Sequence, residues 1–222
     1  MSVSALRRPT PFNLVSLALG VAFLYLPIVI LVIAWGSAIA LGTGLLWRYK
    51  TTPGAAHRMR PDERFPVGSS VPRVPGKATL VMTAHPQCVC TRASLAELAK
   101  LMERVRDRLT AHVLFVRSQD TNWNDSPAWT EAARIPGVTV SWDDDGRESA
   151  LFDAKTSGQT LLYDAAGRLL FGGGITFARG HEGDNAGSRI ILALLAKSTA
   201  GSNESPVYGC ALASTDTENA AK

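Results

Sequence analysis

The sequence lacks charge over one long stretch and contains few cysteines. No Asp, Glu, Lys or Arg occurs between Phe12 and Trp47, and the whole 222-residue chain has only three cysteines. The uncharged stretch is well above the roughly 20 apolar residues that span a bilayer. It is also much longer than the apolar core of a cleaved signal peptide, which has about 7 to 15 residues. The sequence therefore predicts a segment that stays in the membrane.

The length of this stretch leaves two arrangements open. Its 36 residues would extend about 54 Å as one helix, against a hydrocarbon core of roughly 30 Å. A hairpin of two spans needs a turn, and no polar turn residue lies inside the stretch. We prefer a single span with an interfacial remainder, in which Pro27 is a place where the helix can kink.

Acidic residues are absent from the first 60 positions, which carry six of the 23 Lys and Arg residues. These basic residues flank the apolar stretch, where anionic lipid headgroups attract them. The rest of the chain is slightly acidic and has no basic stripe or aromatic platform. This pattern predicts a lipid bilayer as partner and argues against binding to nucleic acid.

Composition divides the chain into four parts. We predict an N-terminal tail and transmembrane anchor over 1–50, followed by a linker rich in Pro, Gly and Ser over 51–75. A globular domain follows over 76–198. A polar tail over 199–222 carries Cys210.

The globular part alternates between strand and helix patterns. A helix is predicted from apolar residues spaced three and four apart, from Leu95 to Leu109. Short apolar runs predict strands, and Asp164–Gly167 predicts a hairpin turn. The order β-α-β-α-β-α-β-β-α is typical of a mixed sheet covered by helices. The other expected elements are strands over 79–82, 112–116, 138–142, 159–163 and 168–172, and helices from 126, over 148–154 and over 188–196.

Three helix starts carry candidate caps. Thr91, or Ser94 with Glu97 three residues later, suits the first helix of the domain. Ser126 is followed by a proline at the first helical position. Asp184 is the expected cap of the closing helix.

The sequence His85-Pro86-Gln87-Cys88-Val89-Cys90 lies between the first predicted strand and helix. A helix N-terminus stabilises a thiolate, so two thiols at this place indicate redox chemistry. We expect Cys88 to be the more exposed, attacking thiol and Cys90 to resolve the mixed disulfide. Arg92 is expected to lower a thiol pKa, and His85 to add positive charge or move a proton. The plainer interpretation is that both cysteines are small buried hydrophobes.

Metal binding is the nearest competing hypothesis. His85, Cys88, Cys90 and Cys210 would form a soft nitrogen and sulfur set suited to Cu(I) or Zn. The sequence leaves three roles open for Cys210: a metal ligand, a partner in a disulfide with a loop cysteine, or a free thiol.

The order of elements, with a cysteine pair at the first helix and a hairpin and helix at the end, resembles the thioredoxin fold. More narrowly, the segments LWRYKTTPG, HPQCVCTRASLAEL, GGGITFARGHEGDN and PVYGC resemble the membrane-anchored RedB-type thioredoxin-like proteins of bacteria. The resemblance covers residues 45 to 213. It implies a single-pass inner-membrane protein whose periplasmic domain exchanges thiols and disulfides with a protein partner and needs no cofactor.

Two departures from thioredoxin relatives stand out. The cysteines form Cys-x-Cys rather than Cys-x-x-Cys, and Gly158-Gln159-Thr160 occupies the region of the usual cis-proline. The missing proline argues against ordinary thioredoxin substrate handling. Gln159 is an accessory candidate for this reason, and His181 is another because it lies in a RedB-like motif.

The sequence thus predicts an anchored thiol-disulfide oxidoreductase. The alternatives are a copper-binding or zinc-binding metallochaperone of the same fold and a non-catalytic tethered interaction domain. Orientation is contested, because Arg48 and Lys50 follow the apolar stretch as Arg7 and Arg8 precede it. The positive-inside rule would hold the domain in the cytoplasm, whereas the resemblance implies the periplasm.

Overall fold

The computed structural model describes residues 11–60, 63–117, 126–198 and 201–212. The chain forms two compact units, Met1–Tyr49 and Lys50–Lys222.

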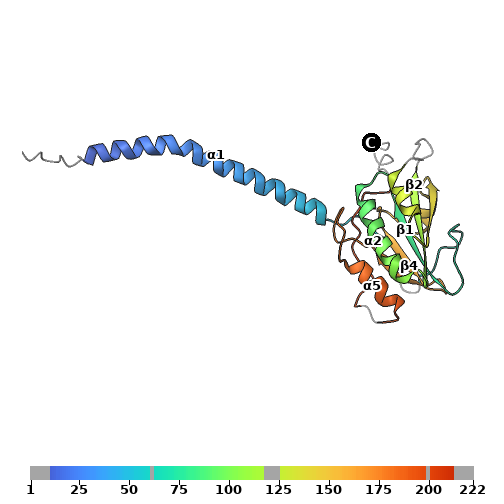
Figure 1. Ribbon diagram of the computed structural model, residues 1–222. Helices are drawn as coiled ribbons and strands as arrows, with labels where there is room; N and C mark the ends of the chain where they lie inside the picture. The colour runs from blue at the N-terminus through green and yellow to red at the C-terminus, as the bar shows by residue number, and fades with distance from the viewer. Residues whose placement is uncertain (1–10, 61–62, 118–125, 199–200, 213–222) are drawn as a thin grey trace, which may run out of the picture. The chain divides into compact units, whose positions relative to one another are not determined.

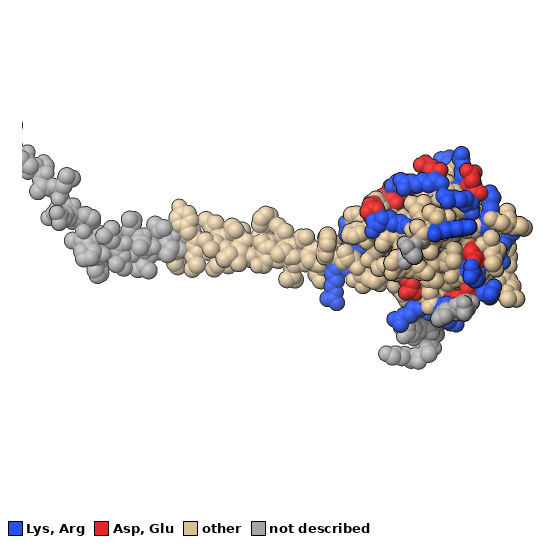
Figure 2. Space-filling model, turned by 90° about the horizontal axis from the view of Figure 1, so that it is seen from below, with Lys and Arg blue, Asp and Glu red and all other residues tan. Residues whose placement is uncertain are grey.

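The first unit is built on one continuous helix, α1 (Pro11–Thr51), which keeps Pro27 in its interior. Its part from Phe23 to Thr51 has 29 residues and a mean hydropathy of 2.3, so it is long and apolar enough to cross a membrane. Side chains from 23 to 50 are all exposed, and Figure 2 shows no charged side chain along the described helix before its C-terminal end. A continuous helix contradicts the alternative of two spans joined by a turn.

The second unit holds the sheet and the remaining helices (Figure 1). Its described elements are β1 (Ala78–Ala84), α2 (Val89–Val105), β2 (Leu109–Arg117), α3 (Pro127–Ala133), β3 (Val138–Asp144), α4 (Arg147–Leu151), β4 (Thr160–Tyr163), β5 (Leu169–Gly173) and α5 (Ala186–Leu195). The strand order is β3-β2-β1-β4-β5. β1, β2 and β3 are parallel, whereas β4 is antiparallel to both β1 and β5. The predicted mixed sheet flanked by helices is confirmed.

The two faces of the sheet are covered differently. α2, α3 and α5 pack on one face, and Figure 1 shows α2 and α5 side by side in front of the sheet. Leu80, Met82 and Phe115 are fully buried beneath them. The other face packs against Phe152, directly after α4, and against Phe65 from the segment that precedes β1.

Several local predictions need correction. Leu109 was expected on the face of the first domain helix, but it is the first residue of β2, because α2 ends at Val105. The N-cap of α2 is Cys88, which makes no side-chain cap bond, and not Thr91 or Ser94. At α5 the cap is not Asp184. The side chain of Asn185 accepts from the Ser188 N–H instead, and Ser126 caps α3 as predicted.

Both segments that flank the domain make specific contacts with it. The Gly54 N–H donates to the Val207 carbonyl at 2.8 Å. The buried His57 ring lies 2.8 Å from Glu63 and 3.2 Å from Asp153. The first bond joins residues 52–60 to the C-terminal segment 201–212, and the contact of His57 with Asp153 attaches residues 52–60 to the domain.

Candidate functional site

Three thiols meet where β1 leads into α2. Cys88 is the N-cap of α2, Cys90 lies in its first turn, and Cys210 comes from the C-terminal segment. The sulfur atoms of Cys88 and Cys210 lie 2.9 Å apart and share a hydrogen bond. Cys88 and Cys90 are each only 4% exposed, so the expectation that Cys88 is the more exposed thiol is wrong. The tail cysteine takes part in the site.

The loop that carries Cys88 is fixed by hydrogen bonds on both sides. The Cys88 N–H donates to the His85 carbonyl at 3.1 Å, and its own carbonyl accepts from the Thr91 N–H at 3.0 Å. The Thr91 hydroxyl donates to the His85 carbonyl and lies 2.9 Å from the Ser157 hydroxyl. The Cys88 sulfur is thereby held at the positive end of α2.

The three thiols differ in proton affinity. Hydrogen bonding from Cys90, together with hydrogen bonding from Cys210, lowers the pKa of Cys88 to about 4 against the opposing effect of burial. The same hydrogen bond to Cys88 raises the pKa of Cys90, and burial raises it further. Burial is the main reason that the pKa of Cys210 rises to about 11, with hydrogen bonding to Cys88 adding to it. These opposite shifts favour a negative charge on Cys88 over one on Cys90 or Cys210.

The cation beside the thiols is Arg179. Its charge lowers the pKa of Cys90 and of Cys210, opposing the stronger effects that raise them. Its guanidinium also donates to the carbonyl of Gly209, next to Cys210. Arg92, predicted to have this role, has a side chain that is 74% exposed and lies 3.7 Å from Glu131.

The other predicted candidates occupy different positions. The ring of His85 accepts a hydrogen bond from the Gln87 N–H at 3.3 Å. Gln159 is buried, and its side-chain oxygen accepts from the N–H of His57, so it ties the preceding segment to the domain. His181 is exposed in the loop before α5.

Sequence reasoning missed three residues of the site. Ser157 donates its N–H to the Cys210 carbonyl at 2.8 Å, and its hydroxyl accepts from the His85 N–H at 3.0 Å. Arg179 and Gly209 lie in the motifs ARGHEGD and PVYGC, but no local pattern assigns them a partner. Glycine immediately before a tail cysteine was the usable signal, because glycine allows close backbone approach.

The copper hypothesis stays a prediction. Among the described residues, no group of three or more His, Cys, Asp or Glu side chains has an arrangement that could hold a metal ion.

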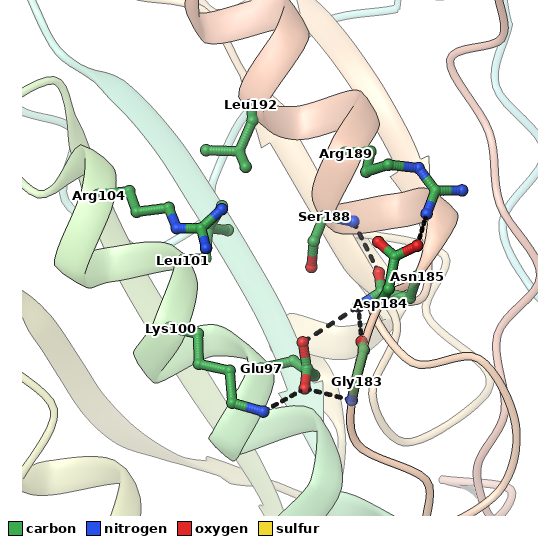
Figure 3. A pocket seen from close by; sticks show the side chains of 10 residues that line it. All are labelled: Glu97, Lys100, Leu101, Arg104, Gly183, Asp184, Asn185, Ser188, Arg189 and Leu192. Carbon is green, nitrogen blue, oxygen red and sulfur yellow. Dashed lines mark hydrogen bonds and ion pairs between the residues drawn. The ribbon is translucent and has the colours of Figure 1, made fainter.

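A separate pocket of about 280 Å³ lies between α2 and α5. Figure 3 shows Glu97 near its centre, with Arg104 and Arg189 at opposite sides. Glu97 is only 5% exposed, and it accepts from the Gly183 N–H, the Asn185 amide and the Lys100 ammonium. These bonds attach the loop before α5 to α2, about two helical turns beyond Cys90.

Comparison with known proteins gives information on the fold. No protein-family model and no curated protein matches the chain. A hypothetical protein from Sinorhizobium meliloti is 17% identical, with a TM-score of 0.55, over 73% of this chain and 97% of that one. An uncharacterised conserved protein from Geobacillus kaustophilus is 18% identical, with a TM-score of 0.52, over 62% of this chain and 77% of that one. A secreted disulfide oxidoreductase from Mycobacterium tuberculosis is 17% identical, with a TM-score of 0.34, over 43% of this chain and 67% of that one. With parallel β1, β2 and β3, an antiparallel β4–β5 hairpin and flanking helices, the second unit has the mixed sheet of the predicted thioredoxin-like fold.

Proposed function

We propose that this protein is a membrane-anchored thiol-disulfide oxidoreductase of RedB type that acts on protein disulfides through Cys88. One observation carries the proposal: the sulfur of Cys88, at the N-terminus of α2 in a thioredoxin-like domain, lies 2.9 Å from the sulfur of a second cysteine, Cys210. The low pKa of Cys88, about 4, keeps it ionised at neutral pH. The thiolate is the form that attacks disulfides.

The chemistry needs two thiols, and the site supplies them. The Cys88 thiolate attacks one sulfur of a substrate disulfide and forms a mixed disulfide. A second cysteine of the cluster then attacks Cys88 and releases the reduced substrate. The reverse sequence of steps gives a disulfide to a substrate dithiol.

The anchor and the compartment complete the proposal. The apolar part of α1 would hold the protein in the inner membrane as a single span, with the thioredoxin-like domain in the periplasm. A membrane-impermeant maleimide should then label Cys88 in cells whose outer membrane alone has been permeabilised. Labelling that requires lysis of the inner membrane would place the domain in the cytoplasm.

Reduction of insulin by dithiothreitol tests the activity. The full chain in detergent should accelerate the reaction, and Cys88→Ser should lower the acceleration by about 100-fold or more because the attacking sulfur is gone. Glu103→Ser is a matched control, because Glu103 is exposed on the same helix. Its activity should equal that of the unchanged protein.

Two other outcomes would favour the competing hypotheses. Equal activity of Cys88→Ser and Glu103→Ser, with both loop thiols inert to alkylation in the folded protein, indicates a non-catalytic interaction domain. Stoichiometric Cu(I) uptake that is lost on removal of Cys88 or Cys90, without insulin reduction, indicates a metallochaperone.

A further inference from the structure

The C-terminal segment 201–212 is bonded to the domain directly beside the thiol loop. The Ser157 N–H donates to the Cys210 carbonyl at 2.8 Å, and the Leu212 N–H donates to the Lys155 carbonyl at 3.0 Å. Thr156 and Ala211 form the antiparallel bridge between these two bonds. Backbone pairing at Cys210 and at the two residues after it therefore fixes where its sulfur lies.

Buried side chains and a close backbone approach add to this pairing. Val207 and Leu212 are buried, and the Ser205 hydroxyl donates to the Gly174 carbonyl at 2.7 Å. Gly209 lies so close to the Ser157 carbonyl that a β-carbon at this position would overlap it. The segment is an integral part of the domain, and it points a cysteine at Cys88.

We infer that Cys210, rather than Cys90, is the resolving cysteine, so that the oxidised protein carries a Cys88–Cys210 disulfide. The inference rests on the proposed function and assigns a catalytic residue within it. The two sulfurs are already 2.9 Å apart, and a bond of roughly 2.05 Å requires only a small approach.

Cys90 is placed less well for this step. It lies within the first turn of α2, where its carbonyl accepts from the Ser94 hydroxyl. A disulfide between residues two positions apart closes a very small ring, so a bond between Cys88 and Cys90 would distort the turn that holds the thiolate. Cys90 acts as a positioning residue that donates a hydrogen bond to the Cys88 thiolate.

The proposed reaction consists of two successive thiol-disulfide displacements. Cys88 thiolate attacks the substrate disulfide, a Cys88–substrate bond forms, and the first substrate thiolate leaves and takes a proton from water. Cys210 loses its proton to solvent and attacks the Cys88 sulfur. The Cys88–Cys210 bond forms, the Cys88–substrate bond breaks, and the second substrate thiolate leaves. The substrate disulfide gains two electrons, and the two protein thiols are oxidised.

Charge controls the order of these events. The negative charge on Cys88 is one of the causes that keep Cys210 protonated, and it disappears when the mixed disulfide forms. The Arg179 charge then favours the Cys210 thiolate without that opposition. The resolving thiol is activated once there is a mixed disulfide to attack.

Disulfide mapping tests the inference. The reduced full chain in detergent is freed of reductant, mixed with insulin, quenched with acid, alkylated and digested with trypsin. Cys88 and Cys90 share the tryptic peptide 78–92, whereas Cys210 lies in 198–222. The unchanged protein and Cys90→Ser should both give these two peptides joined by a disulfide. Cys210→Ser should accumulate the Cys88–insulin mixed disulfide at least about tenfold above the unchanged protein.

Two results would contradict the inference, and they can be told apart. An internal disulfide within 78–92, with Cys210→Ser as active as the unchanged protein, would make Cys90 the resolving thiol and overturn the inference alone. Equal reaction of the unchanged protein and Cys88→Ser with insulin would overturn the proposed function and the inference with it. Matching circular dichroism spectra of the serine variants show that the comparison is between folded proteins.

Discussion

Cys88 is the residue on which the account depends, and its chemistry comes from its neighbours. Hydrogen bonds from Cys90 and Cys210 favour the charged form of Cys88 more than burial disfavours it. The cluster thus sets the reactivity of Cys88.

The pH dependence of alkylation checks this interpretation. Because the pKa of Cys88 is about 4, its rate with iodoacetamide should stay level as the pH falls from about 8 to about 6 and decrease only near pH 4. Cys90→Ala removes the hydrogen bond that lowers this pKa most, so the decrease should begin at higher pH. The rate is followed at Cys88 by mass spectrometry.

The pH dependence of the alkylation rate in the unchanged protein decides whether Cys88 is a thiolate. A rate that falls about tenfold per pH unit below pH 8 would be that of an ordinary thiol with a pKa near 8.5, and it would contradict the proposed thiolate.

Among the elements, α2 and the C-terminal segment matter most for the site. Apolar spacing predicted α2, and apolar runs predicted the strands β1 and β2, because each pattern is local in the sequence. The place of Cys210 was not predictable in the same way. It depends on hydrogen bonds from Ser157 and on the close approach of Gly209, and these partners are far apart in the chain. The caps of α2 and α5 were also misassigned, since several neighbouring polar residues suit each cap.

Gly209→Ala tests how the C-terminal segment is attached. Its β-carbon would overlap the Ser157 carbonyl, so the segment must move away from the thiol loop. We expect iodoacetamide to label Cys88 faster by about tenfold as the segment moves off, and a loss of roughly 1 to 3 kcal/mol of unfolding free energy. Gly201→Ala is the control, because nothing lies within 4 Å of its β-carbon position. Equal labelling rates in the two variants would show that the segment does not restrict Cys88.

Glu97→Ala tests the attachment of the loop before α5 to α2. The change leaves the Gly183 N–H and the Asn185 amide without their carboxylate acceptor (Figure 3). Buried donors without partners are costly, so urea unfolding should show a loss of about 2 to 3 kcal/mol. Glu103→Ala, an exposed change on the same helix, should stay within about 0.5 kcal/mol. If Glu97→Ala loses no more unfolding free energy than Glu103→Ala does, other contacts hold the loop.

The whole molecule combines an apolar helix with a thioredoxin-like domain. The basic residues of the first 60 positions flank the apolar stretch, and the domain itself carries both signs of charge, as the mixed blue and red of Figure 2 shows. This division suits the proposed function, in which a protein tethered at a bilayer acts on other proteins through the thiol cluster of Cys88, Cys90 and Cys210.

Redox titration of the full chain in detergent tests whether Cys88 and Cys210 form a reversible disulfide. The protein is equilibrated with glutathione buffers of graded potential, quenched with acid, and the fraction of Cys88 in a disulfide is measured by mass spectrometry. We expect one reversible two-electron transition, from three free thiols to a Cys88–Cys210 disulfide, which Cys88→Ser abolishes. Cys88 that stays a free thiol at every potential would contradict this expectation.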